Sequence, residues 1–310
     1  MKNLSMKKIM KKEQGFTLLE LLVVITLLAI LSVGALVAYE GVGDNAQATA
    51  AANNTAGADR AIRNYKAVTL NYPNQWDSLV TTTGATPAFL ATQTTAKFAN
   101  LALPVSAAAN DFRDTLDQRI EGVGIGELQA RLITAATPNV EPNLQHNEGA
   151  LGASALTDVV EDDFDNFTNL SILPTFGTVA CSVNGVAMAA VKLDGTTPIA
   201  AADGQRQNAI NDALGTQQCN LVLALGFGHD AAHSTNTSSV AIATAPTFVS
   251  KNINPAKNYA RYVALFHVGA DTVAPLNDIT VDELFAKPRL LAVVDTEGNA
   301  IDENIAKQNP

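Results

Sequence analysis

One stretch near the N-terminus constrains this chain more than any other, because the nineteen residues from Leu21 to Tyr39 carry no charged side chain. As an α-helix, a stretch of that length measures about 28 Å, close to the roughly 30 Å of a bilayer's hydrocarbon core. Five lysines and one glutamate precede Gly15. Because short lysine-rich segments stay on the cytoplasmic side, we expect a membrane-spanning helix that delivers the rest of the chain across the membrane.

Glu20 lies at the start of this apolar region, where a carboxylate is costly unless it pairs with a cation. No lysine or arginine follows it within one helical turn. Cleavage after Gly15 would give Phe16 a free α-amine, whose pKa is normally about 7.7 to 8.0. We therefore predict that Glu20 pairs with the Phe16 amine of a neighbouring copy, and that this pair sets the register of assembly.

The residues around this position resemble a known export signal. Lys11 to Gly15, followed by Phe16-Thr17-Leu18-Leu19-Glu20 and an apolar run, is similar to the class III signal of bacterial type IV prepilins and type II secretion pseudopilins. The resemblance covers about 30 of the 310 residues. It implies cleavage between Gly15 and Phe16 by a prepilin peptidase, N-methylation of Phe16, and contact of Glu20 with the neighbouring N-terminus in a helical filament.

Two positions depart from the commonest pattern of that family. Ala29 stands where many members have glycine, and Val37 where many have proline, so both favour an unbroken helix. An ordinary secretory signal is disfavoured because its apolar core is shorter and a small-x-small cleavage site follows it. A plain membrane anchor explains neither Glu20 nor the Gly15-Phe16 pair.

We expect three segments: a leader over residues 1–15 that is removed, an apolar helix and stem over 16–70, and a globular body over 71–310. A sub-boundary is expected near 137–157, where prolines and glycines gather. Loss of the leader takes five of the 20 basic and one of the 30 acidic residues, leaving a net charge of about −14. Such an acidic body argues against nucleic acid as a partner.

The stem can be placed from its pattern. Gly41-Val42-Gly43 should loosen the helix, which we expect to resume because apolar residues return at helical spacing at Ala58, Ile62 and Tyr65. Turn-forming residues 71–74 should end it.

The segments after the stem carry weaker signals. The tract from Tyr72-Pro73 onward resembles major pseudopilins, in which a short helix follows, and residues 81–110 read as a loop. Helices are expected over 111–121 and 127–135, on either side of a glycine-rich hinge.

The C-terminal half favours β-structure. A helix is expected over 205–214, a capping box at Thr280 should open a short helix that ends at Pro288, and residues 295–299 should form a hairpin turn. Strands are predicted over 186–193, 219–225, 238–243, 259–268 and 289–294. The predicted fold is α+β and pilin-like, with a long N-terminal helix packed on a mostly antiparallel sheet and an enlarged C-terminal region.

The chain contains two cysteines, Cys181 and Cys219. In an oxidising compartment an isolated pair usually forms a disulfide, and closing a loop of this length stabilises a fold by about 3 to 4 kcal/mol. We predict a disulfide, with two separately buried thiols as the alternative.

Metal ligands could come from three clusters. His229-Asp230-Ala231-Ala232-His233 would place two imidazoles on one helical face, as in zinc metalloproteases, but its context is typical of a surface loop and Asp230 replaces the catalytic glutamate. Acidic side chains suited to structural calcium gather at two other places. The first cluster comprises Asp163 and Asp165, and the second comprises Asp295, Glu297, Asn299 and Asp302. The resemblance to pseudopilins, which carry calcium near a C-terminal loop, favours the second cluster. No other cofactor is expected, and neither His146 nor His267 has an evident partner.

These patterns favour a structural subunit, not an enzyme. We expect a type IV pilus-like filament protein, inserted in the inner membrane and polymerised through its N-terminal helix into a cell-surface or periplasm-spanning fibre. Its partners would be copies of itself, the peptidase, the inner-membrane assembly platform and the membrane. The alternatives are a pseudopilin of a type II secretion system, and a ligand-binding or metal-dependent domain displayed on a prepilin-type stem.

Overall fold

The chain divides into two compact units, Met1–Ala46 and Gln47–Pro310. The first contains the apolar region of one long helix, and the second contains the rest of that helix and the body. The computed structural model describes residues 16–103, 112–131, 143, 159–174, 181–188, 191–199, 214, 219–274 and 276–306.

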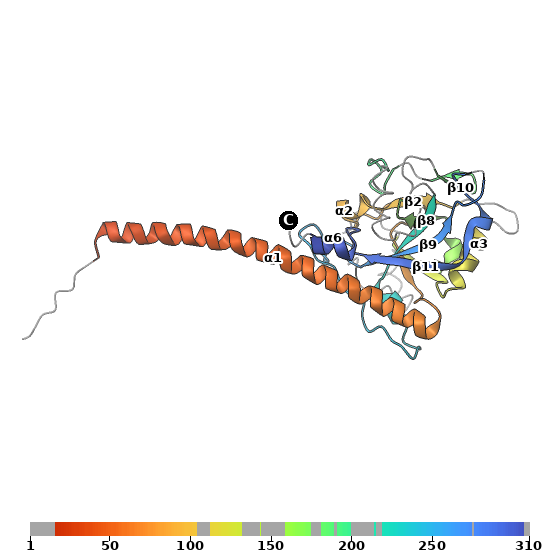
Figure 1. Cartoon of the computed structure of the whole chain (residues 1–310), viewed down its shortest axis with the longest axis horizontal. Coiled ribbons are helices and arrows are strands. Elements are labelled where there is room, and N and C mark those ends of the chain that lie inside the picture. The colour runs from red at the N-terminus through yellow and green to blue at the C-terminus, as the bar shows by residue number, and fades with distance from the viewer. Residues whose placement is uncertain are drawn as a thin grey trace, which may run out of the picture. The chain divides into compact units, whose positions relative to one another are not determined.

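Helix α1 runs without a break from Leu18 to Thr69 (Figure 1). The expected loosening at Gly41-Val42-Gly43 is therefore wrong. Each glycine costs a helix about 1 kcal/mol relative to alanine. The alanine-rich turns that follow Gly43 offset this penalty. The helix ends where Leu70 adopts a φ of 65° and its N–H donates to the Lys66 carbonyl at 2.9 Å, a left-handed C-terminal cap.

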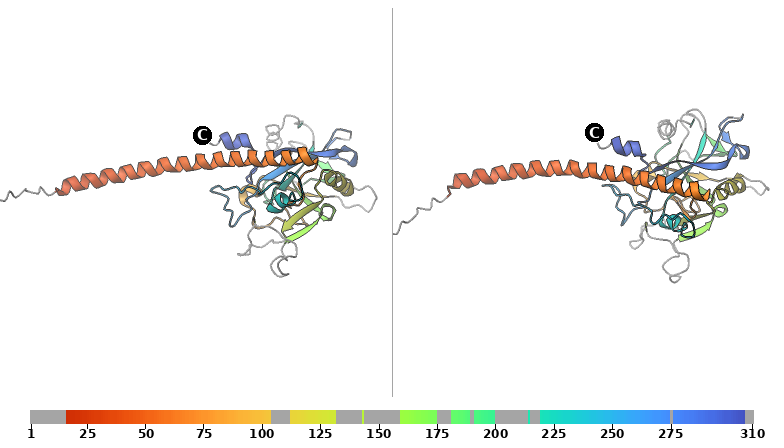
Figure 2. Two further views of the ribbon diagram at one scale, coloured as in Figure 1. Left: turned by 90° about the horizontal axis from the view of Figure 1, so that it is seen from below. Right: turned by 60° about the horizontal axis from the view of Figure 1, so that its bottom comes forward.

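The stem, residues 47–69 of α1, packs on the body through one face. Ala58, Ile62 and Tyr65 are buried, as their spacing predicts. Arg63 Nη2 donates to the Leu291 carbonyl at 3.0 Å, which fixes the stem to the last strand of the sheet. Figure 2 shows this region of α1 lying along the body.

The body is built on a mixed sheet of eight strands within the described residues. All of its pairs are antiparallel except β1–β3. The α+β, mostly antiparallel expectation is confirmed, and the long N-terminal helix with this sheet is consistent with a pilin-like fold. The main path runs β11 (Leu284–Val294), β9 (Val263–Ala270), β8 (Asn220–Gly226), β1 (Trp76–Ser78), β3 (Glu127–Arg131) and β4 (Val159–Asp163), while β5 (Asn169–Ile172) joins β8 to β2 (Ala99–Ala102).

Both faces of the central strands are covered, so every residue of β8 and β9 is buried. Leu223 of β8 belongs to the larger hydrophobic cluster, together with Ile62 of the stem and Trp76. Val222, on the opposite face, belongs to a second cluster with Phe98. The sheet therefore divides the body into two core layers, one of them shared with the stem.

Smaller elements surround this sheet. A second, three-stranded sheet has the order β10-β6-β7. Its strands are β10 (Asp278–Ile279), β6 (Ser182–Val183) and β7 (Val186–Ala187). The helices of the body among the described residues are α2 (Thr92–Thr95), α3 (Phe112–Glu121), η1 (Phe164–Asn166), α5 (His229–His233), η2 (Val281–Glu283) and α6 (Ile301–Ala306).

Several local predictions are wrong because tertiary pairing overrides local propensity. The expected helix over 127–135 begins with strand β3, which lies between β1 and β4. The residues after Tyr72-Pro73 form β1 and not a short helix, and the supposed loop over 81–110 contains α2 and β2. No strand forms over 238–243.

The glycine-rich segment after α3 is a turn, as expected. Gly124 has a φ of +102°, and a Cβ there would lie 2.6 Å from the Cβ of Asn71. Glycine is therefore required where this turn passes the end of the stem.

The C-terminal predictions are confirmed only for some elements. Thr280 and Glu283 form the capping box, but the short helix ends at Glu283 and Pro288 lies inside β11. The turn over 295–299 forms, with the Gly298 N–H donating to the Asp295 carbonyl at 2.8 Å, yet α6 follows it and not a strand. The predicted linker near 137–157, apart from residue 143, and most of the predicted helix over 205–214 lie outside the described residues.

Candidate processing, assembly and metal sites

Phe16 is the first residue that the structure describes, and it is 83% exposed. Gly15 lies outside the described residues, so cleavage between the two stays a prediction.

Thr17 and Glu20 cap the start of α1. The N–H and Oγ1–H of Thr17 both donate to Glu20 Oε2 at 2.9 Å, and the Glu20 N–H donates to Thr17 Oγ1 at 3.3 Å. This reciprocal arrangement is a capping box, which provides acceptors for amide groups that a helix start leaves unpaired. The prediction of a cationic partner for Glu20 overlooked Thr17, although the Thr-x-x-Glu pattern ahead of an apolar run is visible in the sequence.

The apolar side chains near the start of α1 are exposed on every side of the helix. Between Phe16 and Val42, the exposed fraction of the large apolar residues ranges from 46% at Val23 to 87% at Leu18. A helix that is apolar all round requires lipid or other apolar helices as its surroundings. By length and composition α1 can cross a membrane, and it is the one such helix among the described residues.

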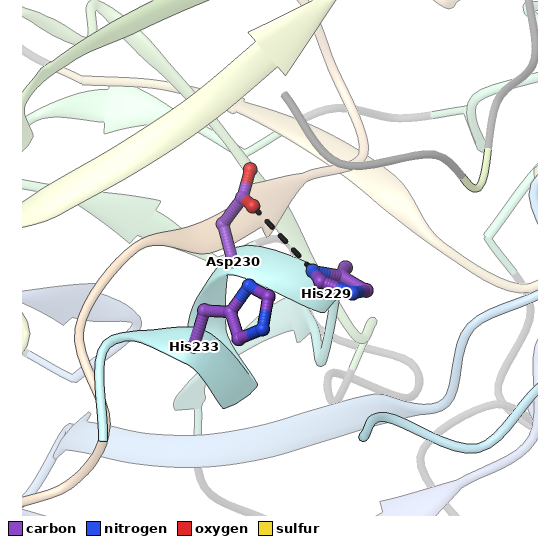
Figure 3. A group of neighbouring side chains, drawn as sticks. All are labelled: His229, Asp230 and His233. Atoms are coloured by element: carbon purple, nitrogen blue, oxygen red, sulfur yellow. Dashed lines mark ion pairs between the residues drawn. The ribbon is translucent and has the colours of Figure 1, made fainter. Parts of the chain in front are cut away.

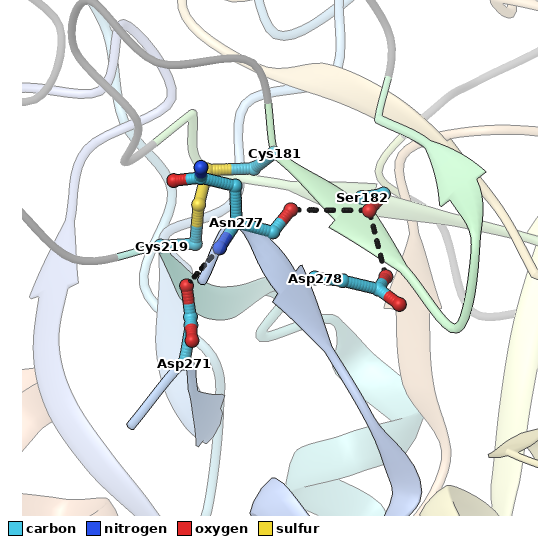
Figure 4. Close-up of a disulfide and its surroundings, with 6 residues drawn as sticks. All are labelled: Cys181, Ser182, Cys219, Asp271, Asn277 and Asp278. Carbon is cyan, nitrogen blue, oxygen red and sulfur yellow. Dashed lines mark hydrogen bonds between the residues drawn. A yellow bond between two sulfur atoms is a disulfide. The ribbon is translucent and has the colours of Figure 1, made fainter. Parts of the chain in front are cut away.

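The disulfide between Cys181 and Cys219 is confirmed (Figure 4), with the two Cα atoms 5.9 Å apart. Both cysteines are buried, and the bridge joins the small sheet to the start of β8. Hydrogen bonds around it reinforce the connection: the Ser182 N–H donates to the Asn277 carbonyl at 2.8 Å, and the Asn277 N–H donates to Asp271 Oδ2. We assign it a structural role.

Three of the four residues of the C-terminal acidic cluster gather in the turn before α6. Asp295, Glu297 and Asn299 are buried, whereas Asp302 is exposed. Amide groups already approach the Asp295 carboxylate: the Asn299 N–H donates to Oδ1 at 2.9 Å, and Asn304 Nδ2 donates to Oδ2 at 2.9 Å. These bonds account for the turn, and calcium binding there stays a prediction.

The other acidic cluster lies at the surface. Asp163 and Asp165 are exposed. They face Asp117 of α3, and burial of Asp117, with repulsion from Asp165, Glu121, Asp163 and further carboxylates, raises its pKa to about 6. Calcium at Asp163 and Asp165 likewise stays a prediction.

The His-Asp-His cluster lies on helix α5 and not in the expected surface loop (Figure 3). One potential ligand atom from each of His229, Asp230 and His233 lies within 4.8 Å of the other two. The two imidazole centroids are 4.1 Å apart, with the rings nearly perpendicular. Asp230 is buried, and its Oδ1 lies 3.8 Å from His229 Nδ1. Burial and the neighbouring His233 lower the pKa of His229.

His267 is a buried structural residue of β9, and His146 lies outside the described residues. Arg289 Nη2 donates to His267 Nδ1 at 3.1 Å, so Nε2 carries the proton and donates to Asn220 Oδ1 at 3.1 Å. Burial and the nearby Arg289 lower the pKa of His267 to about 4.

Comparison with known proteins gives one positive finding. No curated protein and no solved structure matches the chain. Residues 10–36 match the family model of the prokaryotic N-terminal methylation motif. This segment includes Gly15, Phe16 and Glu20 and leads into the long apolar helix, which fits a protein anchored in the inner membrane and assembled into an extracellular or periplasmic filament. The motif implies processing by a prepilin peptidase and indicates a structural subunit rather than an enzyme. The chain thus carries a class III prepilin signal at the start of its apolar helix.

Proposed function

We propose that this protein is a structural subunit of a type IV pilus-like filament. It would be inserted in the inner membrane, cut after Gly15, methylated on Phe16 and polymerised through its N-terminal helix. The observation that carries the proposal is the exposed apolar surface of α1 between Phe16 and Val42. Lipid would cover this surface before assembly, and the helices of neighbouring copies would cover it afterwards.

Glu20 has two candidate roles in this scheme, and both can hold in sequence. In the single chain its carboxylate accepts hydrogen bonds from Thr17. In the filament it would also pair with the Phe16 amine of an adjacent copy, which stabilises two charges that apolar helices surround. The first role needs only a hydrogen-bond acceptor, whereas the second needs a negative charge.

Matched variants separate the two roles. Glu20→Gln keeps a carbonyl oxygen as acceptor for the Thr17 N–H but removes the charge, and Thr17→Val removes the hydroxyl but leaves the charge. We expect Glu20→Gln to be processed and to accumulate in the membrane without forming filaments, while Thr17→Val still assembles. Electron microscopy and immunoblots of sheared surface material, with the membrane fraction as the loading control, measure this.

Filaments from Glu20→Gln but none from Thr17→Val would contradict the charge-pairing role and leave helix capping as the function of Glu20. Filament-derived material should also have an intact mass that begins at methylated Phe16, and a mass that includes residues 1–15 would overturn the proposal as a whole. Recovery of fibres from the cell surface distinguishes a pilus from a periplasm-spanning pseudopilus.

A further inference from the structure

The cluster on α5 is not used by the proposed function, since none of its residues belongs to the apolar helix or to the stem. We infer that His229, Asp230 and His233 form a binding site for a divalent transition metal, Zn²⁺ in the first place. The site would have three protein donors, two imidazole nitrogens and one carboxylate oxygen, and a remaining position for water.

The donor set favours zinc over calcium. Calcium takes six to eight oxygen ligands, and the cluster offers two nitrogen donors and a single carboxylate. Zinc accepts nitrogen and oxygen donors at about 2.0 to 2.2 Å, so ligand atoms in a tetrahedral shell lie about 3.3 Å apart. The donors here lie within 4.8 Å of one another. Rotation of the two half-buried imidazoles would close the difference.

The local structure holds the helix that carries these donors. At its start, a Cβ on Gly228 would lie 2.3 Å from Asp77 Oδ2, so the backbone there passes directly against β1. At its end, the Asn74 N–H donates to Ser234 Oγ at 3.0 Å. Between these points Ala231 and Ala232 are buried in the core. The core side of α5 is therefore fixed, which leaves His229 and His233 one turn apart on the other side.

A second observation points to a missing partner at this place. His229 Nδ1 is inaccessible to solvent and makes no hydrogen bond within the described residues. Asp230 Oδ1 lies 3.8 Å from it, beyond hydrogen-bond distance. Buried polar atoms of this kind normally have a partner. A metal ion between the imidazole and the carboxylate would supply one.

The charge of Arg261 acts on His229, and hydrogen bonds fix where this guanidinium lies. The guanidinium donates to the Ala245 carbonyl through Nη1 and to the Asn143 carbonyl through Nη2, both at 2.6 Å. These bonds hold it on the 245–247 segment and on residue 143, so it serves the packing of that region.

The test uses the full-length chain in detergent, purified without a polyhistidine tag, stripped with a chelator and then titrated with Zn²⁺ alone. We expect one zinc per chain in the wild type. Loss of an outer-shell partner costs about 10–100-fold in metal affinity, and His229→Ala and His233→Ala should each weaken binding by more than that. Asp230→Asn should weaken zinc binding less than either histidine variant does. His146→Ala, which removes a histidine elsewhere in the sequence, is the matched control and should bind as the wild type does.

Two further measurements guard against misfolded variants. Thermal unfolding should shift upward on addition of Zn²⁺ for the wild type and for His146→Ala, but not for His233→Ala, while the metal-free transitions of all three coincide. Co²⁺ bound in place of zinc should give the intense visible absorption of a four-coordinate site in the wild type but not in His233→Ala. Equal zinc binding by the wild type and both histidine variants would overturn the inference, as would a wild type that binds none.

Discussion

Residues 18–46 and 47–69 belong to one continuous helix, yet their side chains meet different surroundings. In the first segment the large apolar residues are exposed on every side, and Ile25, for example, is 52% exposed. In the second segment a single stripe is buried, and Ile62 within it is fully inaccessible. The two segments therefore use the same backbone geometry for different purposes.

The difference shows how the distribution of apolar residues around a helix, and not their presence, identifies its partner. A one-sided stripe leaves a polar face for water and matches a single packing surface. An apolar residue at nearly every position fits only surroundings that are apolar on all sides. The stem is accordingly a folding element of the body, whereas residues 18–39 are suited to lipid and to helices of other copies.

The largest expected effect comes from the same substitution made in each segment. Ile62→Ala removes a fully buried side chain and should lower the free energy of unfolding of the body by about 2–5 kcal/mol. Ile25→Ala removes an exposed one and should leave that free energy unchanged. Trp76, the single tryptophan and a buried core residue, reports the transition by fluorescence in urea titrations of the detergent-solubilised chain.

Filament yield should reverse the order of these two variants. Ile25→Ala weakens contacts between helices of neighbouring copies, so we expect it to reduce filaments while the body remains stable. Equal losses of unfolding free energy in both variants would show that residues 18–46 fold against their own body, which would remove the distinction between the two segments.

A smaller effect should appear as a pH dependence that only the body shows. His267 is neutral when folded, with a pKa of about 4, against about 6.5 in an unfolded chain. Between these values the unfolded chain binds the extra proton, so stability should fall as the pH is lowered from 6.5 toward 4, by up to about 3 kcal/mol. His267→Gln has no proton to gain and should flatten this slope in the Trp76 assay.

Asp117 contributes in the opposite direction over the same range. Its raised pKa of about 6 means that the folded chain protonates first, so stability from this group rises as the pH falls toward 4. The informative quantity is therefore the difference between the wild type and His267→Gln, not the slope of the wild type alone. Identical slopes of stability against pH in the wild type and in His267→Gln would contradict a neutral His267 whose Nδ1 accepts from Arg289.

The smallest effect concerns the last turns of the first segment, just before its junction with the second. Apart from the helix's own backbone, no atom of the described residues lies within 4 Å of a Cβ built on Gly41 or Gly43, so alanine fits at both positions. Each replacement should stabilise the helix by about 0.5–1 kcal/mol and slow amide hydrogen exchange there by about 2–5-fold. Gly34→Ala, at an equally open position in the apolar segment, is the control. Unchanged exchange at the junction would indicate that the helix is interrupted there.

Local sequence signals predicted the elements that depend on local physics. The stem stripe at Ala58, Ile62 and Tyr65, the strands near residues 219–225 and 289–294, and the Thr280 capping box were all predictable. Strand β3 was not, because its central position between β1 and β4 comes from residues far along the chain. Residues 127–135 considered alone have a helical pattern.

The candidate sites divide in the same way. The prepilin-type signal and the cysteine pair followed from short patterns and from the compartment that they imply, while cleavage after Gly15 and the pairing of Glu20 stay predictions. The placement of His229 and His233 on a short helix did not, because its neighbours Asn74 and Asp77 lie more than 150 residues away in the sequence. The Thr17 cap was predictable from the sequence and was overlooked.

The sequence by itself determined where the chain meets the membrane, since nineteen consecutive uncharged residues after a lysine-rich leader suit few other surroundings. It also determined which face of the stem is buried. Only the tertiary structure decided which segments become sheet neighbours and which polar side chains meet, such as His267 and Asn220. The reason is physical: transfer of a helix into lipid depends on composition summed along a short segment, whereas strand pairing and ligand geometry depend on contacts between distant segments.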